Sequence, residues 1–126
     1  MTGKSGKIAR MSDAIVILCT CPDERAAEAL GRGLLSARLV ACVNVLPSVR
    51  SMYRWHNEIM DEQEVLLLIK TMNSRFEKVS AWLTAHHPYD VPEVVALPTQ
   101  AVSAPYLEWL DASVSGPEVT EDRRDD

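Results

Sequence analysis

The stretch Glu-Val-Leu-Leu-Leu-Ile-Lys-Thr at residues 64–71 decides the fold. It is a continuous apolar run of strand length, which predicts a β-strand covered on both faces. Such a strand lies in the middle of a sheet. The segments before and after it must then supply the strands that pair with it and the helices that pack on it.

The segment before it, residues 40–55, predicts a long second strand joined to it by a tight hairpin. Its apolar and aromatic residues at odd positions should share one face: they are Val43, Val45, Val49, Tyr53 and Trp55. Pro47 predicts a bend, a bulge or an unpaired edge. In the turn His56-Asn57-Glu58, Asn57 can take a left-handed conformation.

An amphipathic helix is predicted on each side of this hairpin. Residues 14–20 form a short β-branched strand, and Pro22-Asp23-Glu24 then opens a helix. Its apolar face is spaced by three and four residues (Ala27, Leu30, Leu34 and Ala37). Gly31 and Gly33 weaken this helix by about 1 kcal/mol each, and close packing is one explanation for them.

After the hairpin, Ser74 and Glu77 have the spacing of a capping box and open a second helix. Its inner face carries Phe76, Val79 and Leu83, and it ends near His87, because Pro88 disfavours helix in the residue before it. Residues 94–97 predict a fourth strand. A last helix starts at Ser103 and should turn inward the residues Tyr106, Leu107 and Leu110.

The resulting order is strand, helix, strand, strand, helix, strand, helix, which is an α+β ferredoxin-like plait with an antiparallel sheet. Its strands should lie in the spatial order fourth, first, third, second. We expect one domain at residues 13–115, flanked by a disordered N-terminal arm (1–12) and a disordered acidic tail (116–126).

Composition excludes several classes of function. With 13 basic and 18 acidic residues the chain has a net charge of −5, which argues against nucleic-acid binding. No apolar run is long enough to cross a membrane. Met1–Ser12 lacks the apolar core of a secretory signal, and an odd count of 3 cysteines argues against a disulfide scaffold. We therefore expect a cytoplasmic protein.

The chain directions bring distant reactive residues together. The first strand ends at Cys19, and the antiparallel fourth strand begins shortly after His86 and His87, so both points lie at one edge of the sheet. The residues expected there are Cys19, Cys21, His86, His87 and Glu93. Thiolate and imidazole suit copper or zinc, so Cys19, His86 and His87 are candidate ligands. Cys42 and Lys70 belong at the opposite edge.

Two other interpretations of this edge cluster remain open. The cysteines can be packed as small apolar side chains, and the histidines can cap the end of a helix. Alternatively, Cys19 could be a nucleophile with His87 as its base and Glu93 orienting it. The sequence around these residues shows no sign of an oxyanion hole, so we expect no enzymatic activity.

The long hairpin also predicts an oligomer. It overruns the other strands, and its exposed aromatic residues would be costly unless covered. A closed ring of copies would cover Tyr53 and Trp55, which are therefore candidate trimer-interface residues. The alternative is a hairpin that folds over its own sheet.

Six blocks of sequence, in order, resemble the CutA-type divalent-cation tolerance proteins over about residues 13–113. They are Leu-Cys-Thr-Cys-Pro-Asp (18–23), Leu-Val-Ala-Cys-Val-Asn (39–44), Tyr-Arg-Trp (53–55), Glu-Val-Leu-Leu-Leu-Ile-Lys-Thr (64–71), His-Pro-Tyr-Asp-Val-Pro-Glu (87–93) and Tyr-Leu-Glu-Trp-Leu (106–110). Two positions depart from the family pattern. Asn57 in the hairpin turn stands where glycine is usual, and Asp90 stands where glutamate is more typical.

This resemblance implies a cytoplasmic homotrimer associated with tolerance to copper and other divalent cations, with copper proposed at the positions of Cys19, His86 and His87. We expect weak binding of copper or a similar ion, and no protein partner is identified. The alternative is a non-enzymatic regulatory or scaffold trimer that senses a small ligand in its subunit clefts, by analogy with PII-type signalling proteins.

Overall fold

A computed structural model gives the structure of the chain and describes residues 13–116. The elements are β1 (Ala14–Cys21), α2 (Glu24–Ser36), β2 (Cys42–Trp55), β3 (Glu58–Met72), the short 3₁₀ turn η1 (Asn73–Arg75), α3 (Phe76–His86), β4 (Val95–Pro98) and α4 (Ala104–Val114). This order is the predicted one, and the fold is ferredoxin-like. The expectations for residues 1–12 and 117–126 lie outside the described residues.

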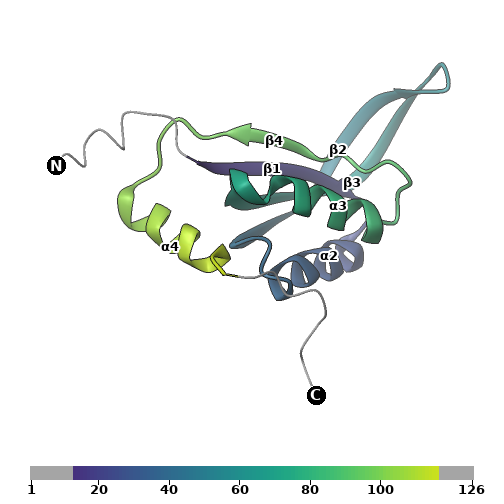
Figure 1. Cartoon of the computed structure of the whole chain (residues 1–126). Coiled ribbons are helices and arrows are strands. Elements are labelled where there is room, and N and C mark those ends of the chain that lie inside the picture. Colours follow the sequence, from purple (N-terminus) through teal and green to yellow (C-terminus); the bar gives the residue numbers. More distant parts are fainter. Residues whose placement is uncertain (1–12, 117–126) are drawn as a thin grey trace.

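The four strands form one sheet in the order β2-β3-β1-β4, as predicted. Strand β1 runs antiparallel to both of its neighbours, β3 and β4. Strand β3 is therefore central. In Figure 1 β1 and β4 lie above α2, and the β2–β3 hairpin projects beyond the other strands.

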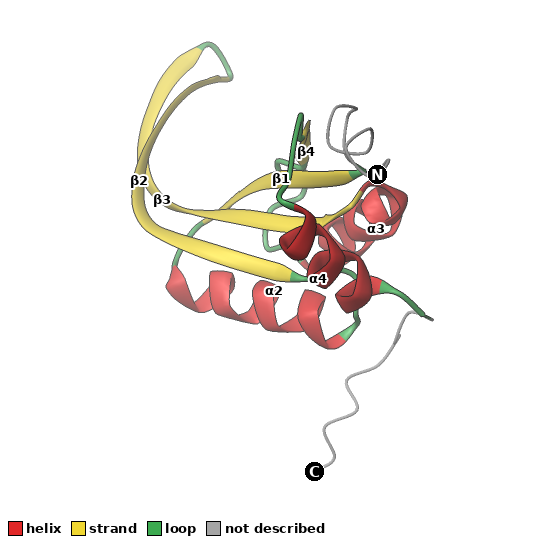
Figure 2. Ribbon diagram, turned by 90° about the vertical axis from the view of Figure 1, so that its left-hand side faces the viewer, coloured by secondary structure: helices red, strands yellow, loops and turns green. Residues whose placement is uncertain are grey.

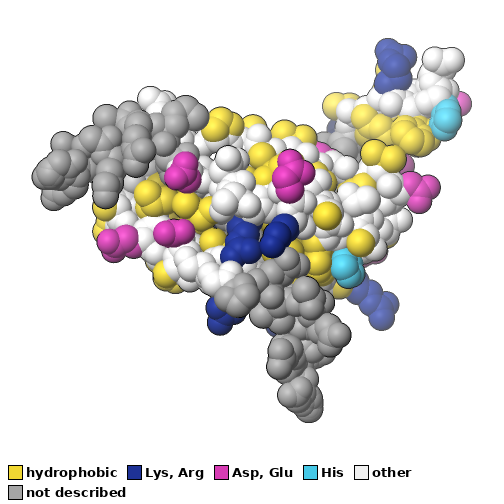
Figure 3. All heavy atoms as spheres, in the orientation of Figure 1, with side chains coloured by type: hydrophobic (Ala, Val, Ile, Leu, Met, Phe, Trp, Pro, Cys, Tyr) yellow, Lys and Arg dark blue, Asp and Glu magenta, His cyan; other side chains and the backbone are white. Residues whose placement is uncertain are grey.

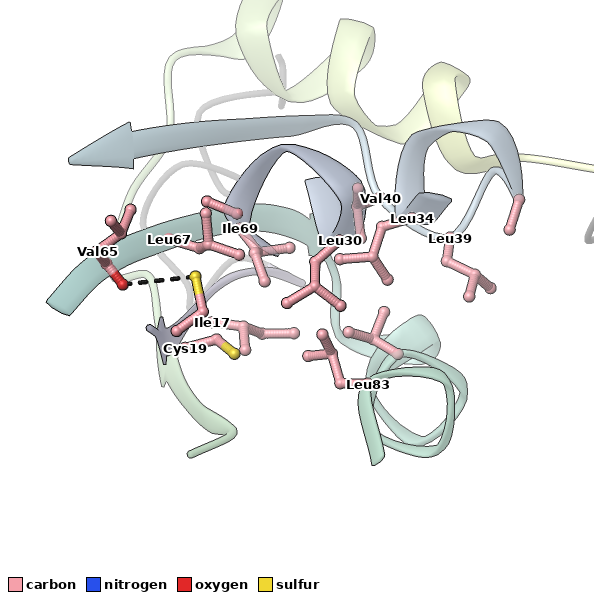
Figure 4. Close-up of a cluster of buried hydrophobic side chains, with 14 of the residues drawn as sticks. Ile17, Cys19, Leu30, Leu34, Leu39, Val40, Val65, Leu67, Ile69 and Leu83 are labelled. Atoms are coloured by element: carbon pink, nitrogen blue, oxygen red, sulfur yellow. Dashed lines mark hydrogen bonds between the residues drawn. The ribbon is translucent and has the colours of Figure 1, made fainter. Parts of the chain in front are cut away.

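Helices α2 and α3 cover one face of the sheet and form the main core with it (Figure 2). Ile17 of β1, Leu34 of α2 and Leu67 of β3 are fully buried there, and Leu83 closes the core from α3 (Figure 4). Helix α2 begins as the sequence predicts, because the carboxylate of Asp23 accepts a hydrogen bond from the amide of Ala26 at 2.8 Å.

The other face of the sheet is only partly covered. Leu66 and Leu68 of β3 are half-buried, so the prediction that this strand is covered on both faces is wrong for a single chain. The reason is that α4 packs only at the Ala14–Met72 end of the sheet, where it forms a second, smaller cluster with Leu110 and Val114.

Pro47 lies in a β-bulge, which the sequence offered as one of three possibilities. Leu46 pairs with Leu66, but Val49 pairs with Glu64, so β2 contains one residue more than β3 between these points. Ser48 takes a left-handed conformation, with φ 68°. One extra residue inverts the alternation of side chains. The prediction that the odd residues of β2 share one face is therefore wrong: Val43 and Val45 face one side, whereas Val49, Tyr53 and Trp55 face the other.

Among residues 13–116, no third strand lies beside the outer part of the hairpin. Beyond the bulge, residues 49–55 pair with residues 58–64, and β1 ends at Cys21, opposite Val65. The tip is a tight turn in which His56 and Asn57 have φ values of 50° and 67°, as the left-handed expectation for Asn57 required. Hydrophobic side chains gather on this arm (Figure 3).

Two local predictions about the helices are wrong. In the described part of the chain, no side chain caps the start of α3 or of η1, because the short 3₁₀ turn at 73–75 occupies the place of the predicted capping box of Ser74 and Glu77. Tyr106 is 38% exposed rather than turned inward. The inner face of α4 instead runs through Leu107, Leu110 and Val114.

Candidate metal site at the end of strand β1

The end of β1 and the end of α3 meet at one edge of the sheet. The ring Nε2 of His87 lies 2.9 Å from the carbonyl oxygen of Thr20, and the hydroxyl of Thr20 donates to Glu93 Oε1 at 3.2 Å. Cys42 pairs with Lys70 toward the other end of the strands. Antiparallel chain direction thus brings the thiol-bearing and imidazole-bearing segments together, as the sequence predicts.

The two thiols of this edge lie inside the core. Cys19 and Cys21 are both 0% exposed, and the sulfur of Cys21 contacts the carbonyl oxygen of Val65 at 3.7 Å (Figure 4, dashed line). Burial, helped by the charges of Cys21, Glu93 and Glu64, raises the pKa of Cys19 to about 12. Burial followed by the charge of Asp23 raises the pKa of Cys21 to about 11. At neutral pH both are protonated thiols, which are poor nucleophiles and poor metal ligands.

His86 lies on the outside of the same edge. Its ring stacks on Trp82 with 3.9 Å between centroids, and its Nδ1 donates to the Trp82 carbonyl oxygen at 2.8 Å. This bond fixes the tautomer, so that Nε2 carries the lone pair. Within residues 13–116 no hydrogen bond engages that nitrogen, and the side chain is exposed. His86 can therefore offer Nε2 to a metal ion without losing a contact.

His87 is buried and uses both ring nitrogens. The amide of Tyr89 donates to Nδ1 at 3.0 Å, so the proton must lie on Nε2, which donates to Thr20. Burial lowers the pKa of His87, while the Thr20 carbonyl and the charge of Glu64 oppose this effect. The ring is therefore neutral at pH 7, with its only lone pair already in a hydrogen bond.

These side chains share an edge but do not form a ready-made coordination sphere. Across residues 13–116, no three His, Cys, Asp or Glu side chains are grouped closely enough to hold a metal ion. His86 points outward whereas Cys19 points into the core. In one chain, the donors suit copper by their chemistry, but a metal ion would have to recruit them by movement of side chains.

Three polar residues of this edge were missed by sequence reasoning. Thr20 lies between the two cysteines and binds both His87 and Glu93. The hydroxyl of Tyr89 donates to Oε2 of Glu64, which is 8% exposed, at 2.6 Å. One signal could have found Glu64: a carboxylate begins an otherwise apolar strand, and a buried carboxylate requires a partner.

Comparison with known proteins identifies the family. The family described as "CutA1 divalent ion tolerance protein" matches residues 15–113. The chain belongs to this family. The CutA1 match spans every element of the fold from β1 to α4, so it includes both ends of the edge described above.

Individual relatives agree over most of the chain. The divalent-cation tolerance protein CutA of Pectobacterium atrosepticum is 43% identical over 104 residues, which cover 82% of this chain and 94% of that protein. A solved CutA1 structure from Thermus thermophilus has a TM-score of 0.79 at 42% identity and covers 81% of this chain and 99% of its own.

A solved CutA structure from Archaeoglobus fulgidus, described as a periplasmic divalent cation tolerance protein, has a TM-score of 0.79 at 30% identity and covers 81% of this chain and 99% of its own. In the described part of the present chain, no helix combines the length and the apolar character needed to pass through a bilayer. The CutA1 family thus gives a relation to divalent cations, and the names of these relatives describe tolerance rather than a reaction.

Proposed function

We propose that this CutA1-family chain is a cytoplasmic homotrimer that binds copper or a similar divalent ion weakly at the end of β1, through His86, His87 and Cys19. The observation that carries the metal site is the 2.9 Å contact between His87 Nε2 and the Thr20 carbonyl oxygen. It holds two imidazoles beside a strand end that contains two thiols. Imidazole and thiolate together suit copper better than calcium or magnesium.

Weak binding follows from the hydrogen bond, the proton or the burial that a donor side chain must lose before it can bind the metal ion. Nε2 of His86 has no hydrogen-bond partner among residues 13–116, which makes His86 the first ligand. His87 must break a hydrogen bond, and Cys19 must lose a proton whose pKa is raised to about 12 and must leave the core. Only metals that compete strongly for soft donors, copper above all, compensate for these costs. Zinc should bind less tightly by the same argument.

Assembly as a trimer is supported by the surfaces that one chain leaves open. Val95 and Leu97 of β4 are 44% and 45% exposed on the sheet face that α2 and α3 do not cover. On the hairpin, Trp55 is 57% exposed and Tyr53 is 40% exposed. Contiguous apolar surface of this kind marks an interface. A closed ring of copies would bury the open sheet face and the hairpin together.

The cysteines support a reducing compartment and a non-enzymatic role. All three cysteines, Cys19, Cys21 and Cys42, are free. Free thiols persist in the cytoplasm, where disulfides are rare. The raised pKa of Cys19 also opposes a Cys–His nucleophile, because the thiolate and not the thiol attacks.

Calorimetric titration with Cu²⁺ and with Zn²⁺ tests the metal site. The variants are His86→Ala and the double variant Cys19→Ser/His87→Ala. His56→Asn is the matched control, since it removes an exposed imidazole from the hairpin turn and asparagine tolerates the positive φ there. Copper affinity should fall at least tenfold in both site variants and stay unchanged in the control. Equal copper affinity in all four proteins would refute the proposed site.

Fluorescence gives a second, local readout. Copper bound at His86 Nε2 would lie beside the indole of Trp82, because the two rings stack at 3.9 Å. Copper should therefore quench tryptophan emission in the wild type and less in His86→Ala. Quenching of equal depth in both proteins would place copper elsewhere.

Sedimentation equilibrium tests the assembly. The wild type should sediment as a trimer, and Trp55→Ser should shift the equilibrium toward smaller species. Val91→Ser is the control, because Val91 is 85% exposed and lies on the loop before β4 rather than in the hairpin. A wild type that sediments as a monomer would refute the proposed trimer while leaving the metal site to the calorimetric test.

A second candidate function is supported by a groove between α2 and β2. Its volume is about 690 Å³, within the range of small-molecule sites, and Arg25, Arg32, Val43 and Val45 are among the residues that line it. The groove opens beside the edge strand β2, so a neighbouring copy could complete it. A ligand-sensing trimer would show thermal stabilisation by small metabolites but not by metal ions. Stabilisation by copper alone would favour the metal-binding role.

A further inference from the structure

A short chain of contacts ties His87 to the base of the hairpin. The amide of Tyr89 donates to His87 Nδ1 at 3.0 Å, and the rings of these two residues lie 4.8 Å apart. The phenol of Tyr89 then donates to Oε2 of Glu64 at 2.6 Å. The residue that occupies the lone pair of His87 is thus itself held by strand β3.

Glu64 is held in place by burial and by strand pairing. Glu64 is 8% exposed and pairs with Val49 in the ladder immediately after the bulge, where the hairpin leaves the body of the sheet. A hydrogen bond from a hydroxyl to a buried carboxylate is short and strong. The pKa of Tyr89 is raised, first by burial and then by its bond to Glu64, so the phenol keeps its proton and donates throughout the neutral range.

A metal ion can bind His87 only through a nitrogen lone pair. In the tautomer that its two hydrogen bonds require, Nε2 carries the proton and Nδ1 carries the single lone pair. The Tyr89 amide fills that position. Metal binding at Nδ1 therefore requires the Tyr89 backbone to move away. Binding at Nε2 requires it too, because the proton would then sit on Nδ1 and face the same amide. The bond from the Tyr89 phenol to Glu64 resists that movement.

We propose that the Tyr89–Glu64 hydrogen bond is a latch that weakens metal binding at His87. This inference rests on the proposed function, in which His87 is a ligand. Tyr89 and Glu64 are positioning residues, because they act through the position of the Tyr89 amide and do not touch the ion. Since Glu64 belongs to the hairpin base, a displacement of the hairpin on assembly would reach His87 through the same bond.

Tyr89→Phe opens the latch with the smallest change, because it removes one oxygen atom and keeps the ring that packs on His87. Tyr106→Phe is the matched control on the exposed surface of α4. Calorimetry of the full chain with Cu²⁺ should show copper binding about tenfold tighter in Tyr89→Phe than in the wild type, the loss of one strong hydrogen bond. Tyr106→Phe should match the wild type. The double variant Tyr89→Phe/His87→Ala should lose the gain.

A readout without metal tests the latch itself. Amide hydrogen exchange at residue 89 should become at least tenfold faster in Tyr89→Phe, because the amide no longer stays on His87 Nδ1. Glu64→Gln acts at the other end of the bond and should change exchange and copper affinity in the same directions. It serves as the second variant if Tyr89→Phe folds poorly.

The outcomes separate the latch from the proposed function. If the wild type binds no copper but Tyr89→Phe does, weak binding by the native chain fails and the latch stands. If Tyr89→Phe binds copper no tighter than the wild type, or not at all, the latch is overturned. Unchanged exchange at residue 89 in both latch variants also overturns it, whatever copper does.

Discussion

A β-carbon on Gly33 would lie 2.5 Å from the indole ring of Trp82, so the absence of a side chain at position 33 is what allows α3 to pack this closely on α2. Trp82 is in turn the ring on which His86 stacks. One glycine in α2 therefore sets the position of a candidate ligand in α3.

Gly33→Ala should destabilise the protein, although alanine is the better helix former. Alanine gains about 1 kcal/mol of helix propensity, but a contact at 2.5 Å forces Trp82 to shift, and overpacking costs about 1–3 kcal/mol. Gly31→Ala is the matched control, because its β-carbon would lie 3.5 Å from Val43, an ordinary contact. Urea denaturation should show Gly31→Ala more stable than the wild type and Gly33→Ala less stable. The opposite order would contradict the packing argument.

Thr71→Val should cost about 1–2 kcal/mol of unfolding free energy. Thr71 is 0% exposed, and its hydroxyl donates to the carbonyl oxygen of Leu39 at 2.8 Å. Valine keeps the shape but leaves that buried carbonyl without its donor. Thr84→Val makes the same change at an exposed helix position and should stay within about 0.5 kcal/mol of the wild type. Equal losses at both positions would show that the buried hydrogen bond is not the cause.

The buried His87 should make stability depend on pH. Burial lowers its pKa below the ordinary 6.5, so between that value and the lower folded pKa the unfolded chain binds more protons than the folded one. Unfolding free energy should therefore fall as the pH drops below about 6.5. Urea denaturation at about pH 7.5 and about pH 5.5 should show a smaller drop for His87→Gln than for the wild type. An equal drop in both proteins would assign the dependence to other groups.

The three thiols should react at different rates in the folded protein. Burial raises the pKa of Cys19 to about 12 and that of Cys21 to about 11, and neither is exposed, whereas Cys42 is partly exposed. An alkylating reagent near neutral pH should label Cys42 first and the other two only after unfolding. Cys42→Ser should abolish the early labelling. Rapid labelling of Cys19 would restore the nucleophile hypothesis.

The strand order and the meeting of two distant segments were predictable because chain direction fixes them. Once the apolar run at 64–71 is central and β1 is antiparallel to β4, the end of β1 has to lie beside the end of α3. Which way each side chain points was not predictable in this way. Cys19 faces the core because of its place in the alternation of β1, while His86 faces outward because α3 ends one residue before the extended His87.

Spacing alone also failed where two faces were equally consistent with it. Tyr106 has the right interval to join Leu110 on the inner face of α4, but Leu107 and Val114 fill that face instead. Pro47 marked the place of a disruption in β2. The number of extra residues there depends on the pairing with β3, which no local pattern contains.

That extra residue has a consequence for how the projecting arm could change. A deletion of Ser48 would keep every aromatic group of the hairpin and would still turn the whole distal half over, so that Tyr53 and Trp55 exchanged sides with their neighbours in sequence. In this segment, the number of residues as well as their side chains determines what a neighbouring molecule meets. The deletion of one residue here should therefore disturb more of the surface than any single substitution, because it turns over every side chain beyond the bulge.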